Sequence, residues 1–274
     1  MFHLDHDADG PPESPAQLRE AVLGTLRNEM TLDPKHSAVV IDDAAEGDAD
    51  LIVSLTGARV STDVPPKKPA PVGERRPGPD FRHVKVHAEP MSLDEARVTL
   101  DLDARGVRCV YDRDADDGRW VLMLDDVADG RVDVAIPQAD LHALIERKVR
   151  EGAKQQDAQV DRVDLTLAQA GPRSVSVKAT VSGGKKVAFL TAPFTADVLG
   201  ELHVDDDLEA RLENLSVEGH GKVLSMLTGL LEPKLREVER KRLPLTALPL
   251  GQARIRDVSV TVGDDVKVHA SFGK

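Results

Sequence analysis

The sequence predicts an α+β fold organised around antiparallel strands. Apolar and polar residues alternate through most of residues 84–217, as expected of strands with one buried face. The links between these strands are short, which favours antiparallel pairing because parallel neighbours need a long crossover. No strand–helix–strand rhythm of a parallel sheet is present. We therefore expect a long antiparallel sheet with one face covered by three amphipathic helices.

Two helices are predicted ahead of the C-terminal third. The first spans about residues 15–30, where Ser14 suits the N-cap and Pro15 suits the first turn. The second spans about residues 138–151 and follows directly after a strand. Their apolar stripes are Leu18, Val22 and Leu26 in the first helix, and Leu141, Leu144, Ile145 and Val149 in the second.

The C-terminal third predicts a helix followed by a β-hairpin. The helix spans about residues 220–242, and Pro233 inside it is expected to produce a kink or a break. The hairpin turns at Gly263 and alternates with a period of two. This part of the chain has a large apolar surface and no catalytic constellation. Its apolar positions include Leu224, Leu227, Leu230, Leu231, Leu235, Val238, Ile255, Val258, Val260, Val262, Val266, Val268, Ala270 and Phe272.

Proline, glycine and polar residues divide the rest of the chain. Residues 1–14 are polar and predict a flexible tail, so we expect a single domain over residues 15–274. Residues 61–80 contain six prolines and predict a mobile loop without strand or helix. Gly183 and Gly184 predict a tight turn between two strands.

The composition favours an aliphatic interior. Of the 274 residues, 41% are hydrophobic but only 3% are aromatic, so any cavity would have walls of Val, Leu and Ala. Such walls suit an acyl chain better than a flat ring or a sugar, although the same residues fill many ordinary cores. The net charge of −12 and the pI of about 5.2 argue against nucleic-acid binding and against strong attraction to anionic lipid surfaces.

Cysteine content and the N-terminal residues bear on the compartment. The single cysteine, Cys109, excludes an internal disulfide and a multi-cysteine zinc site, and its apolar neighbours predict a buried thiol. The first residues lack the basic start and apolar segment of a signal peptide, and no run of about 18 apolar residues predicts a membrane span. The chain as it stands predicts a cytoplasmic protein, or a protein of the cell envelope if a leader has been removed.

No motif in the sequence predicts catalysis, a cofactor or a metal site. The Asp-rich runs 5–10 and 112–117 have calcium-loop spacing but lack the Gly or the Glu that such loops need, so turns are the simpler interpretation. His83 and His87 share a strand face but lie roughly 13 Å apart, too far to share one metal. No Gly-x-Ser-x-Gly elbow or phosphate-binding loop is present. The sequence therefore predicts a protein that is not an enzyme.

Three segments resemble the LmeA-like family of bacterial phospholipid-binding proteins. The clearest comprises residues 243–251, LPLTALPLG, followed by residues 255–260, IRDVSV. A second is the strand-to-helix segment 132–141, VDVAIPQADL, and a weaker third lies within residues 83–107. The family's Pro-Phe-Leu segment after the first helix is not found, and residues 31–80 diverge.

The resemblance implies a tubular lipid-binding (TULIP-like) fold, in which a long curved antiparallel sheet wraps around amphipathic helices. It implies non-enzymatic binding or transfer of a phospholipid or fatty-acyl ligand in an elongated apolar cavity, with peripheral membrane contact and no nucleic acid. Burying about twelve carbons at ~0.8 kcal/mol per CH₂ contributes roughly 10 kcal/mol before ordering costs. The alternative is a ligand-free structural or protein-interaction module with a filled core. The residues expected to line the lipid site are Leu141, Leu144, Ile145, Leu224, Leu227, Leu231, Val260 and Phe272.

Overall fold

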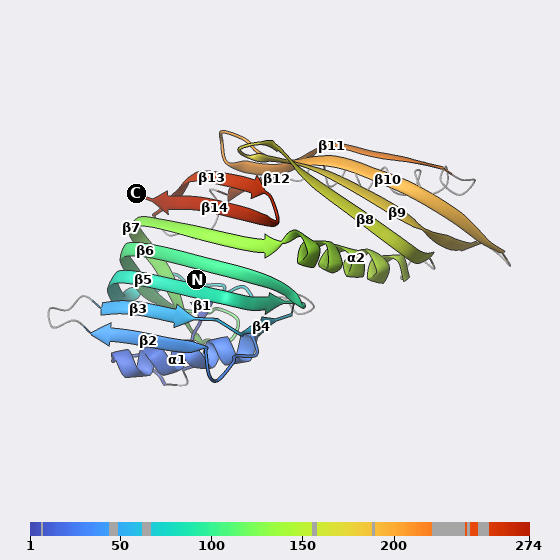
Figure 1. Cartoon of the computed structure of the whole chain (residues 1–274). Helices are drawn as coiled ribbons and strands as arrows, with labels where there is room; N and C mark the ends of the chain where they lie inside the picture. The colour runs from blue at the N-terminus through green and yellow to red at the C-terminus, as the bar shows by residue number, and fades with distance from the viewer. Residues whose placement is uncertain are drawn as a thin grey trace. The chain divides into compact units, whose positions relative to one another are not determined.

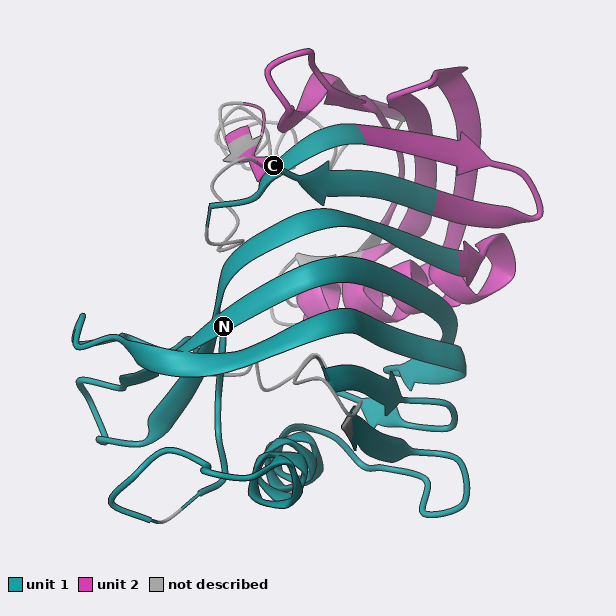
Figure 2. Cartoon of the chain, turned by 90° about the vertical axis from the view of Figure 1, so that its left-hand side faces the viewer, with its two compact units in different colours: residues 1–135, 247–257, 268–274 teal, residues 136–246, 258–267 magenta. Residues whose placement is uncertain are grey.

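The described part of the chain is mostly β-structure with two helices, and the chain divides into two compact units (Figures 1 and 2). One unit comprises residues 1–135, 247–257 and 268–274, and the other comprises residues 136–246 and 258–267. The single domain expected over residues 15–274 stays a prediction. The computed structural model describes residues 1–6, 8–43, 49–61, 67–154, 158–187, 190–220, 239, 242–245 and 252–274.

The larger sheet has nine strands and is mixed. Its strand order is β13-β14-β7-β6-β5-β3-β2, with β1 paired to β7 and β4 paired to β5. Helix α1 (Pro15–Glu29) lies near β2 (Figure 1). The strands are β1 (Phe2–His3), β2 (Ala38–Asp43), β3 (Ala49–Ser54), β4 (Arg59–Val60), β5 (Arg76–Leu93), β6 (Ala96–Arg113), β7 (Trp120–Pro137), β13 (Arg254–Val262) and β14 (Asp265–Gly273).

The smaller sheet is antiparallel throughout, with strand order β12-β11-β10-β9-β8. Helix α2 (Gln138–Lys154) precedes it in the chain and lies against β8. Four of its strands are long and the fifth is short: β8 (Ala158–Gly171), β9 (Ser174–Val187), β10 (Leu190–Val204), β11 (Glu209–His220) and β12 (Arg242–Pro244).

The expectation of one long antiparallel sheet wrapped around helices is wrong in two respects. The described strands form two open sheets, each with two edge strands, and β3 and β4 pair in parallel with β5. The physical reason is the long connection from Ser54 to Arg76, which lets the chain return and start β5 in the direction of β3. Short links elsewhere, as between β5, β6 and β7, give the predicted antiparallel pairs.

Strand β6 is longer than the alternation predicts. It continues past a point at which its buried side chains change from one face of the strand to the other. The pattern predicts separate strands at 98–102 and 107–111, yet both lie in β6. The buried hydrophobic residues of β6 are even-numbered up to Ala104 and odd-numbered from Val107. Between them Gly106 has a φ of 57°, and a Cβ there would lie 3.0 Å from the Cβ of Ala128. Glycine therefore lets one strand pass through the reversal.

The N-terminal residues are held in the fold, which corrects the expectation of a flexible tail. Phe2 and His3 pair with β7, the backbone N–H of Leu4 donates to the carbonyl of Trp120 at 2.7 Å, and Leu4 is fully buried. Trp120, Val121 and Leu4 belong to the buried core of this unit.

The described part of the proline-rich segment contacts the rest of the fold and includes a strand, which corrects the expectation of a loop without strand over 61–80. Residues 67–73 run beside the end of β6, where the N–H of Val72 donates to the carbonyl of Arg113 at 2.9 Å. Residues 76–80 already belong to β5, although they contain two prolines. The register of β5 against β6 shifts between Pro77 and Asp80, and such an irregularity is where a strand tolerates proline. Residues 62–66 lie outside the described part.

Two of the three predicted helices are confirmed. Ser14 caps α1 by accepting a hydrogen bond from the N–H of Gln17 at 3.3 Å, as its sequence position predicts. Helix α2 extends to Lys154, three residues beyond its predicted end. The predicted helix over 220–242 lies outside the described residues, apart from His220 at the end of β11, Glu239, and Arg242 at the start of β12. Among the described residues, no helix is long and apolar enough to cross a membrane.

The predicted C-terminal hairpin is confirmed, but the turn predicted at Gly183 and Gly184 is wrong. Strands β13 and β14 join through a turn at Gly263, whose N–H donates to the carbonyl of Asp265 at 2.9 Å. Gly183, by contrast, lies inside β9 and pairs with Val160 on one side and Phe194 on the other. A Cβ at Gly183 would overlap the carbonyl oxygen of Gln159. The glycine therefore serves close approach of two strands, not chain reversal.

Candidate functional site

The smaller sheet is amphipathic, and its apolar side is the candidate site. Residues paired across an antiparallel ladder share a face, so the register assigns every second residue of each strand to one side. We call this side the aliphatic face. Its aliphatic members include Val163, Leu165, Leu167, Val175, Val177, Ala179, Val181, Ala196, Val198, Leu202, Val204, Ala210, Leu212 and Val217. The register also places Gln169, Gly183, Gly200 and Gly219 on this side.

The aliphatic face is only partly covered. Four of its aliphatic residues are buried: Val163, Val175, Ala196 and Val204. The others are half-buried, except Leu202, which is 38% exposed. Each half-covered aliphatic side chain leaves apolar surface in water, which is unfavourable by about 25 cal/mol per Å².

Helix α2 is held to the edge of the sheet by polar side chains. The Nε2 atom of His142 lies 2.7 Å from the carbonyl oxygen of Val163, and the guanidinium of Arg150 donates to the carbonyl of Asp161 at 3.0 Å. At its start, Gln138 donates its backbone N–H to the carbonyl of Asp264 at 2.9 Å. The bonds to Val163 and Asp161 occupy carbonyls on edge strand β8, which hinders pairing with a further strand.

The apolar stripe of α2 is half-buried. Leu141, Leu144 and Ile145 are all in this class, and none of the residues of α2 is buried. Successive residues are about 100° apart around a helix, so these three lie on a different side from His142 and Arg150. The stripe therefore adds half-covered aliphatic surface to that of the sheet in the same unit.

The remaining predicted lining residues do not form one described cluster. Val260 is buried in β13, where its N–H donates to the carbonyl of Pro172 at 2.9 Å. Phe272 is buried in the other unit, with its ring against Gly130, where no Cβ could fit. Its side chain fills space above a glycine, which is a packing role. Leu224, Leu227 and Leu231 lie outside the described residues.

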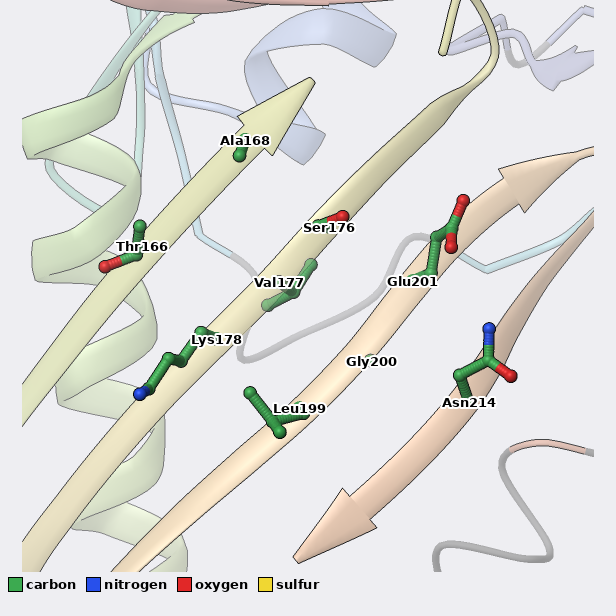
Figure 3. A pocket seen from close by; sticks show the side chains of 9 residues that line it. All are labelled: Thr166, Ala168, Ser176, Val177, Lys178, Leu199, Gly200, Glu201 and Asn214. Atoms are coloured by element: carbon green, nitrogen blue, oxygen red, sulfur yellow. The ribbon is translucent and has the colours of Figure 1, made fainter. Parts of the chain in front are cut away.

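The opposite face of the smaller sheet is polar and carries a shallow hollow of about 280 Å³. Figure 3 shows Thr166, Lys178 and Glu201 projecting from neighbouring strands around it. The ammonium of Lys178 lies 3.3 Å from Asp197, whose carboxylate also accepts from the hydroxyl of Thr180 at 2.7 Å. Because Lys178 is already paired with a carboxylate, the hollow offers no strong anion site.

A polar cluster beside the larger sheet has metal-ligand residue types, with His3 and Asp114 buried and Asp117 exposed. His3, Asp114 and Asp117 offer ligand atoms within 4.8 Å of one another. The ammonium of Lys67 lies 3.1 Å from Asp117 and 3.3 Å from Asp116. The positive charge that these carboxylates require is therefore supplied by the chain itself.

The carboxylate of Asp114 is saturated with hydrogen bonds. Its oxygens accept from the N–H of Ala70 at 2.9 Å, from the N–H of Asp116 at 2.8 Å and from His3 Nε2 at 2.7 Å. Burial raises the pKa of Asp114, but these hydrogen bonds outweigh burial and hold the pKa well below its usual range. Hydrogen bonds from Arg119 likewise lower the pKa of Asp117 to about 2. This arrangement is structural, because it pins residues 67–73 to the turn after β6.

Two further groups have the chemistry of nucleophiles but not the surroundings. Burial raises the pKa of the Cys109 thiol to about 12, which suppresses the reactive thiolate. The hydroxyl of Ser174 lies 2.7 Å from His203 Nδ1, but Ser174 is buried, and the two residues are direct cross-strand partners. A cross-strand hydrogen bond explains this pair without catalysis.

Sequence reasoning identified the alternation that builds the aliphatic face but missed the buried Asp114. The Asp-rich run predicts a turn, and the turn is confirmed, with the N–H of Gly118 donating to the carbonyl of Asp114 at 2.9 Å. Its partner His3 is 111 positions away, so no local pattern could have indicated the contact.

Comparison with known proteins found no matching family model, no matching curated protein and no matching solved structure.

Proposed function

We propose that this protein binds a phospholipid or similar acyl-chain ligand, without catalysis, along the aliphatic face of the smaller sheet. The observation that carries the proposal is the combination of predominantly aliphatic composition and incomplete burial on that face. A ligand that covered the half-buried side chains would remove their apolar surface from water.

The chemistry of the face favours a chain over a ring or a sugar. Most of its side chains are Val, Leu and Ala, which offer neither aromatic stacking surfaces nor hydrogen-bond donors. The amide of Gln169, on the same face, already donates to the carbonyl of Val260 at 2.9 Å. The half-buried stripe of α2, Leu141, Leu144 and Ile145, has the same character. The resemblance of residues 132–141, 243–251 and 255–260 to the phospholipid-binding family also supports an acyl ligand. Since both described sheets are open, the proposed site is an open face within this unit.

A pair of matched variants tests the proposal. Leu202 and Glu201 are neighbours on β10 that face opposite sides of the sheet. We expect Leu202→Lys to weaken binding of a fluorescent fatty acid at least tenfold, because the acyl chain would have to desolvate a charge. Glu201→Lys places the same side chain on the polar face and should leave binding unchanged.

Lipid recovered from the purified protein provides the second measurement. Organic extraction and native mass spectrometry should detect an acyl ligand in the parent and in Glu201→Lys, and less of it in Leu202→Lys. If no lipid is recovered and no fatty acid binds, the proposal fails and the aliphatic face is better explained as a protein-interaction surface. Equal binding by the two variants would also contradict it.

A further inference from the structure

The outermost strand of the larger sheet has an exposed apolar residue at its centre. Within the described part of the chain, strand β2 is the last in the sheet order and pairs only with β3. Val40 is 47% exposed, and its cross-strand partner Ile52 is 37% exposed. Val39, one residue along, is buried on the other face. The apolar pair therefore lies on the outer face of the sheet, directly at its edge.

Strand β2 lacks the features that normally protect an edge. Its sequence, Ala-Val-Val-Ile-Asp-Asp, contains no proline and no lysine, and its register with β3 has no bulge. Edge strands are usually protected by such residues or irregularities, because their unpaired backbone groups otherwise accept another strand. An unprotected six-residue edge with exposed valine is suited to pairing.

The charges around β2 select the partner. Lys35 and His36, just before the strand, are exposed, and Asp42, near its end, is also exposed. Asp33 also lies at the start, 2.9 Å from His36, so that end is mixed in charge. Parallel pairing would align Asp42 with Asp42 of the other copy, whereas antiparallel pairing can set Asp42 opposite His36. We propose that β2 pairs antiparallel with β2 of a second copy of this chain, which joins the two larger sheets edge to edge.

The alternation of side chains fixes the register of this pairing. A two-fold axis at Val39 sets His36 opposite Asp42 of the second copy and Ala38 opposite Val40. Odd-numbered residues of one strand then pair with odd-numbered residues of the other, and even with even. The buried face that contains Val39 therefore continues across the interface. The exposed Val40 side chains of the two copies become diagonal neighbours on the outer face. This interface is independent of the acyl ligand proposed above.

Oligomeric state measured against concentration tests the proposal. The parent chain should show a reversible monomer–dimer equilibrium in sedimentation velocity and light scattering. Val40→Lys introduces the residue that natural edge strands use for protection. It should raise the protein concentration at the midpoint of the monomer–dimer equilibrium at least tenfold. Val268→Lys is the matched control, because Val268 is a strand valine of similar exposure, 38%, on β14. Equal behaviour of the two variants overturns the proposal, as does a parent that is monomeric throughout.

Charge exchange tests the orientation. His36→Glu and Asp42→Lys should each weaken the dimer, and the double variant should restore it, since the register sets position 36 opposite position 42 of the second copy and opposite charges again face each other. Additive weakening in the double variant would refute antiparallel self-pairing. Unchanged unfolding of the variants by Trp120 fluorescence shows that the fold is retained in each.

Discussion

Replacing Asp114 by Asn changes one buried carboxylate to an amide of nearly the same shape. The side chain of Asp114 is fully buried and accepts hydrogen bonds from Ala70, Asp116 and His3. An amide has one oxygen instead of two, so its NH₂ group must face at least one of these donors. We expect the variant to fold with the same topology but with lower stability.

The loss can be worked out from the three contacts. If the amide oxygen takes the position that accepts from Ala70 and His3, the bond from the Asp116 N–H is lost, at about 2 kcal/mol for a bond to a charged acceptor. The two retained bonds lose their charge assistance, at roughly 0.5 kcal/mol each. The sum is about 3 kcal/mol. Asp116→Asn is the control in the same turn, because the side chain of Asp116 is 61% exposed and lies 3.3 Å from Lys67. It should cost well under 1 kcal/mol.

The single tryptophan provides the assay. Trp120 is fully buried in the core of the same unit, so its fluorescence reports urea unfolding there. Because the pKa of Asp114 is lowered in the folded state, its contribution is present above the unfolded pKa of about 4 and is lost as pH falls below that value. The difference in unfolding free energy between the parent and Asp114→Asn should therefore become smaller as the pH is lowered. Equal losses for Asp114→Asn and Asp116→Asn, or a gap independent of pH between 3 and 7, would refute the reasoning.

Two further predictions concern the same unit. Gly106→Ala places a Cβ 3.0 Å from Ala128 at a φ of 57° and should cost about 1–3 kcal/mol in urea unfolding. Gly118→Ala, at a φ of 70° with no atom within 4 Å, should cost less, and the reverse order would contradict the role given to Gly106. Burial raises the pKa of Cys109 to about 12, so a thiol reagent at pH 8 should label Cys109 only when the protein is unfolded. Rapid labelling of the folded protein would show that the thiol is accessible.

Local chemistry made some elements predictable from the sequence. Ser14 and Pro15 mark the start of α1 because a cap and a first-turn proline act within one helical turn. The hairpin of β13 and β14 and the alternation of Val163, Leu165 and Leu167 were equally readable, since a period of two is a local property of a strand. The aliphatic face is thus largely a consequence of sequence pattern.

The pairing of strands within the sheets could not be predicted from the sequence in the same way. The parallel pairing of β3 with β5 depends on where the chain goes after Ser54, and no residue of either strand encodes that path. Gly183 has the composition of a turn, but the close approach of Gln159 keeps it in a strand. Gly106 similarly preserves one strand where the alternation alone predicts two.

The sequence by itself determined which residues are aliphatic, where helices begin and which strand faces are apolar, because these follow from side-chain chemistry and backbone periodicity. Only the tertiary structure decided that the strands divide into two sheets, that β2 is left at an edge, and that His3 meets Asp114 across 111 positions. Those outcomes depend on contacts between segments far apart in the chain, and the free energy of such contacts is not contained in any local pattern.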